Sequence, residues 1–378
     1  AGLLRTAFQS PHAFCRRMIG IERGFAMGTR EGHARPTIKD IAKAAGVGVV
    51  TVSRALNDKP EVSETTRAKV LAVAEKMGYR PNRHARLLKL SHNPAVALVV
   101  KGIDNLFFQQ MLDTMETRVR ERNYLLTLVK VPHWADEVEE AIKFVDEELI
   151  AGVIFLGGSF SHEAYAFERL HAPFVMSTVS RLNKVPDALY SSVSVDDAFE
   201  AEKAVRHLIE LGHTRIAVLG VPSTDVSVGA QRVTGYRHAL AHAGIPVDED
   251  LIRFEVLDQG NPYTLQYGYE LAKKLLAERP EVTAIFAIAD VLAIGAMRAI
   301  REAGLKVPEN ISLVGFDGLP LGDFMDPQLT TLAQPAQQIA RLTCDLLFDQ
   351  IASGPSRHVF VPGTLHRGGS TGPVRTIR

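Results

Sequence analysis

Residues 46–57 read GVGVVTVSRALN, and this stretch decides the fold of the N-terminal part of the chain. It begins like a glycine-rich phosphate loop and ends like a helix with a basic edge. A dinucleotide-binding fingerprint needs a third glycine where Thr51 stands, and it must follow a strand. Here a helical spacing of apolar residues lies on both sides, and no P-loop lysine follows. We therefore interpret the stretch as the turn and second helix of a helix-turn-helix.

The helical spacing extends outward from this turn, from Thr37 to Tyr79. Apolar residues three and four apart predict short helices over residues 37–44, 48–56 and 63–77. Thr37 and Asp40 fit a capping box at the start of the first helix, and Gly46 ends that helix. The sequence therefore predicts an all-α domain over residues 35–82.

The second of these helices has an outer face that is both apolar and basic. The spacing turns Val52 inward and leaves four residues outside, which are Val49, Val50, Ser53 and Arg54. Thymine methyl groups in the major groove of DNA would cover the valines, and an arginine can bind guanine through two hydrogen bonds. The alternative is an ordinary three-helix module that only packs.

Charge is distributed unevenly along the chain, although the total is zero. Residues 30–92 hold thirteen Lys and Arg against six Asp and Glu, whereas residues 93–378 hold 26 against 36. A small basic segment before a large acidic body favours a nucleic-acid-binding domain attached to a second domain.

Cysteine content and hydropathy argue against several protein classes. The two cysteines, Cys15 and Cys344, have no metal-ligand spacing and form no disulfide framework, so we expect a reducing cytoplasm, no metal and no cofactor. No apolar run approaches the ~18 residues of a membrane helix, and no secretory signal is recognisable. We therefore expect no membrane association.

The first residues match no recognisable fold element. The codons for residues 22–24 can form a purine-rich run just before the Met27 codon. We therefore expect translation to begin at Met27 and the leader, residues 1–34, to contribute no folded structure. A flexible basic arm is the alternative.

After Pro94 the pattern changes to short apolar runs, each followed by a turn and a helical segment. These runs lie at residues 95–100, 125–130, 152–157, 173–178, 215–220, 252–257, 284–289 and 312–317. Such alternation predicts an α/β fold of doubly wound parallel sheets, covered by helices on both faces.

We expect this core, residues 94–372, to form two interleaved subdomains. A polar passage at residues 191–197 separates them, and late strands at 329–334 and 358–362 cross back. The first subdomain is then residues 94–195 with 334–363. The second is residues 196–333 with the C-terminal strand.

Candidate ligand-binding residues follow the strands, since ligands of open parallel sheets bind beyond the carboxyl ends of the strands. This rule selects Asp104, Asn105, Phe107, Phe108, Gly157, Gly158, Ser159, Ser177, Thr178, Arg181, residues 223–227, Asp290 and Asp317. Each has a structural alternative: the glycines can form a turn, the phenylalanines can be core residues, and Asp290 can cap its helix.

Several of these segments resemble one known family. Residues 37–82, TIKDIAKAAGVGVVTVSRALNDKPEVSETTRAKVLAVAEKMGYRPN, resemble the DNA-binding domain of lac-repressor (LacI-type) transcriptional regulators. The body carries LGHTRIAVLG, QRVTGYRHAL, DVLAIGAMRAIREAGLKVPENISLVGFD and DPQLTTLAQP, so the resemblance covers nearly all of residues 36–371. It implies a periplasmic-binding-protein-like core and a homodimer on a pseudo-palindromic operator. Gly48 stands where members usually have a capping Ser, so no phosphate contact is carried over there.

The resemblance implies DNA contacts in the helix-turn-helix and in a hinge. The first set is Thr37, Val49, Val50, Thr51, Ser53, Arg54 and Asn57. Residues 83–93 match a hinge helix that folds only on operator DNA, where Leu88 wedges between base pairs and Ala85 lies at the helix pair. Phosphates or groove edges would be held by Asn82, Arg83 and Arg86. Taken alone, residues 83–89 are too few for a stable helix, and a flexible linker is the alternative.

The resemblance also implies an effector site. Arg232 falls at the family's effector-binding arginine, Asp317 at its aspartate, and Tyr263 at an aromatic residue that covers the ligand. An arginine and a carboxylate beside an aromatic ring are typical of a sugar site, so we expect a mono- or disaccharide effector. Family members often carry a polar residue just before the aspartate that Asp290 matches, but this chain has Ala289 there. This difference puts recognition of a hydroxyl group at that position in doubt. The segment GFDGLPLGDFMDPQLTT is similar to members that regulate glucosides and maltodextrins.

Three other functions compete with an inducible repressor. A sugar-binding transport protein would have a signal peptide and no helix-turn-helix. An enzyme would need catalytic residues, but Ala166 stands where a zinc-protease motif after His162 needs its second histidine, and no Gly-x-Ser-x-Gly occurs. A repressor that needs a corepressor remains open, because allosteric coupling takes either sign. A homodimer is expected over a tetramer because the tail has no leucine heptads.

Overall fold

The computed structural model describes residues 37–56, 61–77, 94–147, 149–222, 225–257 and 260–374. The chain divides into two compact units, residues 1–87 and 88–378, and each is described by itself. Some predictions concern residues outside the described ranges: the leader, Asn57, residues 223–224 of the predicted ligand site, and the hinge with Asn82, Arg83, Ala85, Arg86 and Leu88.

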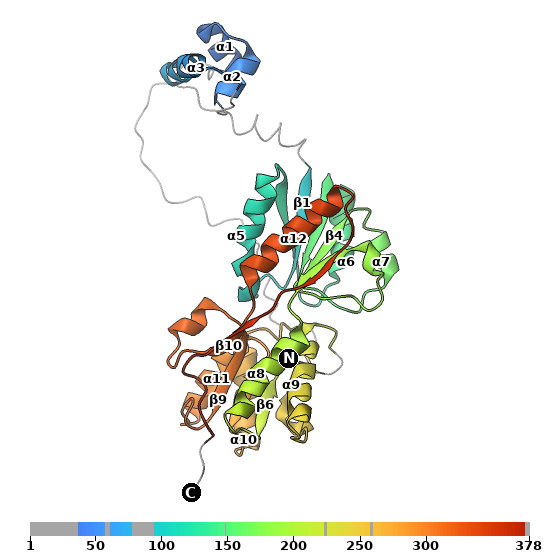
Figure 1. Cartoon of the computed structure of the whole chain (residues 1–378), viewed down its shortest axis with the longest axis vertical. Helices are drawn as coiled ribbons and strands as arrows, with labels where there is room; N and C mark the ends of the chain where they lie inside the picture. The colour runs from blue at the N-terminus through green and yellow to red at the C-terminus, as the bar shows by residue number, and fades with distance from the viewer. Residues whose placement is uncertain are drawn as a thin grey trace, which may run out of the picture. The chain divides into compact units, whose positions relative to one another are not determined.

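The first unit has three helices over its described residues, α1 (Ile38–Ala45), α2 (Val49–Leu56) and α3 (Glu64–Lys76) (Figure 1). The side chains at their centre include Ile41, Val52 and Val70, each 0% exposed. All three predicted helices are confirmed to within one residue at each end.

A complete capping box begins α1. Asp40 N donates to Thr37 Oγ1 (3.4 Å), and Thr37 N donates to the Asp40 carboxylate (2.8 Å). The helix ends at Gly46, whose φ of 67° is a left-handed conformation that costs glycine little. This turn sets the direction in which α2 leaves α1.

The second unit contains two six-stranded sheets, one in each of two lobes. In the first lobe the strand order is β11-β5-β4-β3-β1-β2, and all neighbours are parallel. Its strands are β1 (Ala95–Lys101), β2 (Leu125–Val131), β3 (Ile150–Leu156), β4 (Phe174–Ser177), β5 (Ser191–Ser194) and β11 (His358–Phe360).

Alternate side chains of β1 divide the first lobe into two helix-covered faces. Val96 and Leu98 pack with α5 (Leu106–Glu121) and α12 (Ala336–Ile351). Ala97 and Val99 pack on the other face with α6 (Glu137–Glu147) and α7 (Ala164–Glu168). The near-continuous apolar strands are therefore buried on both faces, as expected of a parallel sheet.

The second lobe has the strand order β12-β10-β9-β8-β6-β7. Its strands are β6 (Ile216–Leu219), β7 (Ile252–Arg253), β8 (Ala284–Ala287), β9 (Ser312–Asp317), β10 (Thr330–Ala333) and β12 (Thr364–His366). Only β12 pairs antiparallel among these, against β10. The helices of this lobe are α8 (Asp197–Glu210), α9 (Val228–His242), α10 (Leu265–Glu278) and α11 (Asp290–Glu302), with the short 3-10 turns η2 (Glu249–Leu251) and η3 (Pro320–Phe324). A further 3-10 turn, η1 (Asp187–Leu189), lies in the first lobe, just before β5.

The chain passes between the lobes repeatedly. It leaves the first lobe after β5, returns after β10 through α12 to β11, and leaves again for β12 (Figure 1). The predicted fold class, an all-α helix-turn-helix domain followed by a two-lobed α/β core, is confirmed.

The prediction of a polar passage over residues 191–197 is wrong in its first half. Residues 191–194 are the buried parallel strand β5. Their hydroxyls made the run look like a loop, but Ser191 Oγ accepts from Arg357 N (3.0 Å) and Ser192 Oγ lies 2.8 Å from His358 Nδ1. Another predicted strand, 252–257, is shorter than expected: it covers only Ile252–Arg253, and Phe254 and Val256 beyond it are exposed.

Hydropathy agrees with the architecture. Within the described ranges, none of the helices combines the length and apolar character needed to cross a membrane.

Candidate functional site

The outer face of α2 is the first candidate site. Val49 is 41% exposed and Val50 63% exposed, and Arg54 is exposed one turn further along the helix. Thr51 and Ser53 are half-buried. The structure thus places two valines and an arginine together on one surface of the helix.

Thr37, predicted to contact DNA, is exposed at the start of α1. Its hydroxyl donates to the Asp40 carboxylate (2.7 Å), which also accepts the Thr37 backbone N–H. The side chain therefore has a structural role in the cap, and a DNA contact would have to share this hydroxyl.

The second candidate site is a cavity between the two lobes of the core. The first-lobe residues that line it are Lys101, Gly102, Asn105, Phe107, Phe108, His133, Gly157, Gly158, Ser159, Thr178 and Val179. The second lobe and the return segment supply Asp225, Val226, Ser227, Val228, Arg232, Asn261, Tyr263, Asp317 and Gln334. Many of these residues follow the carboxyl end of a parallel strand, where the sequence placed the ligand.

Four of the predicted ligand-binding residues lie outside this lining: Asp104, Ser177, Arg181 and Asp290. Ser177 is buried, and its hydroxyl lies 3.0 Å from Thr343 Oγ1. Asp104 is exposed, in the turn between β1 and α5. Arg181 has a side chain 60% exposed and pairs with Asp187 (3.2 Å). Asp290 is 0% exposed and lies behind the cavity wall, not in it.

Asp290 is not the cap of α11 either, since the helix begins at this residue and Ala289 occupies the cap position. Its carboxylate accepts from Leu319 N (2.7 Å) and from the Thr331 hydroxyl (2.6 Å). Burial, with the nearby Asp317 charge, raises the pKa of Asp290 to about 8. Asp290 therefore fixes the turn that follows β9. Asp317, the last residue of β9, lies next to this turn and lines the cavity.

Arg232 forms the centre of the second-lobe wall. Its Nε donates to Asp197 (2.8 Å), and its Nη1 donates to Ile288 O (2.6 Å) and Asp317 (3.2 Å). The guanidinium carbon also lies 3.8 Å from the ring centroid of Phe316. Four partners and 4% exposure hold the side chain in one position.

Asp317 is the acidic partner in this wall. It accepts from Gln334 Nε2 (2.8 Å) as well as from Arg232, and its backbone φ of 124° lies in a region that favours glycine. Burial raises its pKa to about 6 although Arg232 opposes the shift. Such a strained, buried carboxylate at a cavity is typical of a functional site.

Tyr263 covers the cavity from the second lobe. Its hydroxyl lies 3.4 Å from Ser227 Oγ, and its ring meets the His133 ring of the first lobe edge-on, with centroids 6.2 Å apart. Burial lowers the pKa of His133, which favours the neutral imidazole there. A second contact joins the lobes where Phe160 N donates to Val226 O (2.8 Å).

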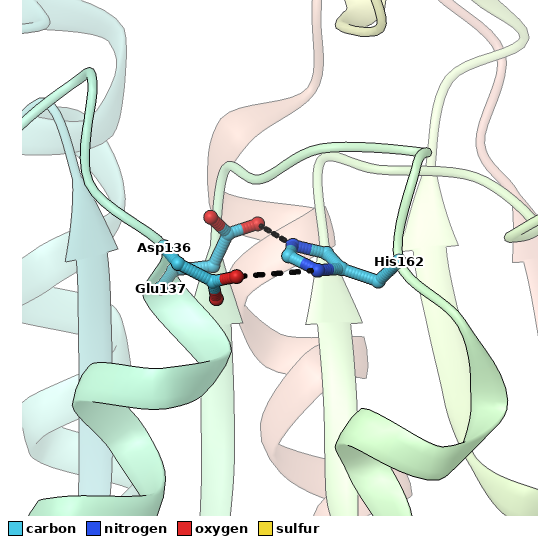
Figure 2. Close-up of side chains that lie close together, drawn as sticks. All are labelled: Asp136, Glu137 and His162. Atoms are coloured by element: carbon cyan, nitrogen blue, oxygen red, sulfur yellow. Dashed lines mark hydrogen bonds and ion pairs between the residues drawn. The ribbon is translucent and has the colours of Figure 1, made fainter.

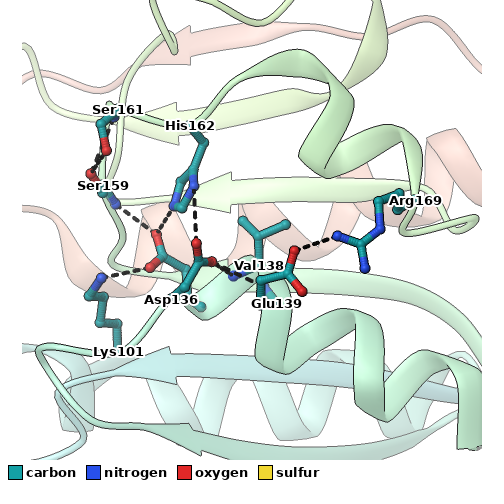
Figure 3. Close-up of polar contacts among 9 residues, drawn as sticks. Lys101, Asp136, Val138, Glu139, Ser159, Ser161, His162 and Arg169 are labelled. Carbon is teal, nitrogen blue, oxygen red and sulfur yellow. Dashed lines mark hydrogen bonds and ion pairs between the residues drawn. The ribbon is translucent and has the colours of Figure 1, made fainter.

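Glu137 organises the first-lobe wall, from the first turn of α6. Its buried carboxylate accepts from Lys101 Nζ (2.7 Å) and Ser159 N (2.8 Å), and it lies 2.8 Å from His162 Nε2. Figure 3 shows Lys101, Ser159 and His162 converging from three different segments. One carboxylate thus joins the end of β1 to the loop after β3.

Burial opposes ionisation of Glu137, but the hydrogen bond with His162 and the Lys101 ammonium outweigh it and lower the pKa to about 2. Burial likewise disfavours the charged imidazole of His162, yet its bond to Glu137 raises the pKa of His162. Glu137 is therefore an anion, and its carboxylate favours the protonated form of His162.

Asp136, Glu137 and His162 have ligand atoms within 4.8 Å of one another (Figure 2). His162 Nδ1 lies 3.9 Å from Asp136 Oδ2, while Asp136 Oδ1 accepts from the N–H groups of Val138 and Glu139. The Glu137 oxygens face an ammonium, an amide and an imidazole. This arrangement satisfies the carboxylates with protein donors, so we interpret it as an ion-pair network.

The sequence missed Lys101, His133 and Glu137. Lys101 is the last residue of β1 and His133 follows β2, so the same strand-end rule could have selected both. Glu137 gave no signal, because an acidic residue in the first turn of a helix is ordinarily a solvated helix-dipole partner.

Comparison with known proteins gives two family matches. Residues 37–82 match "Bacterial regulatory proteins, lacI family", and residues 205–371 match "Periplasmic binding protein-like domain". The chain is 38% identical over 327 residues to the HTH-type transcriptional regulator MalR of Clostridium butyricum, spanning 86% of this chain and 96% of that protein. It is 32% identical to the HTH-type transcriptional repressor CytR of Escherichia coli (strain K12), spanning 86% and 92%. A solved complex of the transcriptional regulator CelR with cellobiose is 29% identical, with a TM-score of 0.63, covering 89% of this chain and 100% of that one.

Proposed function

Because this chain belongs to the lacI family of bacterial regulatory proteins, we propose that it is a transcriptional repressor that a small sugar releases from its operator. The operator is double-stranded, pseudo-palindromic DNA bound by a homodimer, so that the two-fold axes of protein and DNA coincide. The protein acts in the cytoplasm as a regulator and not as an enzyme.

The DNA-binding domain is residues 35–82, with α2 as the helix that enters the major groove. Val49 and Val50 contact thymine methyl groups, and Arg54 reads a guanine. Supporting contacts come from Thr37, Thr51, Ser53 and Asn57. The outer face of α2 is the observation that carries this proposal, since exposed valines beside an arginine are unfavourable until a partner covers them.

Residues 83–93 form the hinge that joins this domain to the core, residues 94–372. Leu88 wedges into the minor groove, Ala85 lies at the pair of hinge helices, and Asn82, Arg83 and Arg86 hold the backbone or groove edges. Folding of the hinge on DNA links operator affinity to the state of the core.

The cavity between the lobes takes the effector. Arg232 and Asp317 bind hydroxyls, while Tyr263, Phe107 and Phe108 contact the apolar face of the ring and Ser159 adds a donor. A sugar is favoured because the similar CelR structure contains cellobiose. Asp290 supports this wall from behind.

The experiment selects binding sites from random duplex DNA with the purified protein, then titrates the complex with maltose, cellobiose and ribose. We expect a pseudo-palindromic consensus, and release of the DNA by at least one sugar. Tighter binding with sugar would instead indicate a corepressor. Failure to enrich any duplex would contradict the DNA-binding role itself.

A further inference from the structure

The cavity contains a lysine whose position is set by a buried anion. The Lys101 side chain is 16% exposed, lines the cavity, and donates to Glu137 Oε2 at 2.7 Å. A lysine ammonium has three donors, and this bond uses one of them. The other N–H groups are free to donate to a ligand oxygen in the cavity.

Glu137 fixes more than the lysine. It is 0% exposed, and the N–H of Ser159, a second lining residue, donates to it at 2.8 Å. The next residue, Phe160, donates its N–H to Val226 O of the second lobe. The same carboxylate therefore positions the ammonium and the loop that meets the opposite lobe.

Carboxylates outnumber cations in and behind the described lining. Arg232 pairs with Asp197 and Asp317 on one wall. On the other wall, Glu137 contacts both Lys101 and His162, and Asp136 lies 3.9 Å from His162. Asp225 adds one further carboxylate to the lining. A ligand phosphate would meet cations that already have partners, whereas hydroxyl groups need only donors and acceptors.

We propose that Lys101 binds the effector directly, that Glu137 is its positioning residue, and that this pair selects an uncharged sugar over the phosphorylated form of the same sugar. The assignment rests on the proposed sugar response and names the first-lobe contact of that site. Arg232 and Lys101 then bind the ligand from opposite lobes.

The test measures sugar binding by calorimetry on the full chain, using maltose and cellobiose and the 6′-phosphate of each. The variants are Lys101→Met, Glu137→Gln and the double variant, with Lys130→Met as control because Lys130 is exposed on β2. Lys101→Met should weaken binding by roughly 10- to 100-fold, as expected for a lost hydrogen bond to a charged group. Lys130→Met should bind like the wild type, and both phosphates should bind more weakly than the parent sugars.

The double variant separates positioning from general damage. If Glu137 acts mainly through Lys101, Glu137→Gln should weaken binding less in the Lys101→Met background than in the wild type, and the remaining loss reports on the Ser159 loop. Should Glu137→Gln fail to fold, Lys101→Arg replaces it, because a retained cation should recover part of the affinity.

Three results would overturn the assignment alone: unchanged sugar affinity in Lys101→Met, additive losses in the double variant, or tighter binding of the phosphates. Absence of any sugar binding in the wild type would remove the sugar response and this assignment together. The two failures are therefore distinguishable.

Discussion

Arg54 and Glu137 are both charged, but one is exposed and the other is buried among hydrogen-bond partners. Arg54 is exposed on α2 with its guanidinium available to a partner, whereas Glu137 is buried and already has three. Sequence alone selected Arg54, because a helical spacing reveals which residues face outward. It could not select Glu137, because its partners Lys101 and His162 are 36 and 25 residues away and meet it only through the sheet.

Replacing Arg54 with Ala should lower operator affinity by ~1–3 kcal/mol and relax the preference at one base pair. The loss is confined to the base that the guanidinium reads, so anisotropy titrations on operators with single substitutions would detect it. Lys76→Ala removes an exposed charge from the end of α3 and should leave the discrimination between operators intact. Equal discrimination by Arg54→Ala and the wild type would count against α2 as the reading helix.

Glu137→Gln should lower the free energy of unfolding at pH 5 by up to about 3 kcal/mol, because the pKa of Glu137 falls from 4.5 to about 2 in the folded protein. A depressed carboxyl pKa stabilises the fold above the unfolded value, and this stability is lost as the pH falls toward 2. The gap between wild type and variant should therefore close from about pH 5 to pH 2 in urea denaturation.

The control for this pH series is Glu140→Gln, whose partly exposed pair with Lys143 should contribute less than about 1 kcal/mol. A gap for Glu137→Gln that stays constant with pH would mean that the carboxylate is not the stabilising species.

The periodicity of apolar residues predicted the helices and strands whose buried side chains are apolar. It failed for the strand whose buried side chains are polar and form hydrogen bonds within the protein. The three helices of the first unit and eight apolar strands follow directly from spacing. The strand β5 did not, since its serines are buried by hydrogen bonds to a segment more than 160 residues later. Long-range partners of this kind leave no local signal.

The strand-end rule located the cavity between the lobes but not every residue that lines it. Parallel strands bring their carboxyl ends to one edge whatever their sequence, so the edge is predictable. Which side chain after each strand points into the cavity depends on the conformation of the loop that follows the strand. Asp104 therefore points to solvent while Asn105, the next residue, lines the cavity and caps α5 by accepting from Phe107 N at 3.0 Å.

The hinge is the element that should couple DNA binding to the core. Leu88→Ala should abolish kinking of the operator, because a small side chain cannot hold a base step open. Gel mobility of circularly permuted operator fragments measures the bend, and calorimetry should find sugar binding unchanged. A fully bent complex with Leu88→Ala would refute the wedge.

At the scale of the whole molecule, Arg232 should separate operator binding from release. Arg232→Ala should leave the operator complex intact below the melting temperature and abolish its release by sugar. It should also destabilise the core by about 3–5 kcal/mol, since Asp197 and Asp317 lose a buried partner. Arg237→Ala, on the same helix but paired with the exposed Glu249, should still be released. Release of Arg232→Ala at wild-type sugar concentrations would exclude it as an effector ligand.

Self-association should depend on η3. Phe324 is 86% exposed and Leu321 43% exposed in this one turn, so that burying them against a second copy would be favourable. Phe324→Ser should weaken the dimer by roughly tenfold or more, about 1.4 kcal/mol, in sedimentation experiments. Phe199→Ser, which removes another exposed ring from α8, should not. A wild-type protein that sediments as a monomer would contradict the homodimer.

The three passages of the chain between the lobes limit how such a protein can be recombined. Exchanging the N-terminal DNA-binding domain for another requires a single junction in the gene, ahead of β1. Exchanging one lobe would require three junctions to be matched at once, two of them flanking α12 and β11. New pairings of operator and inducer should therefore arise in evolution, and in the laboratory, by transplanting the DNA-binding domain onto an intact body.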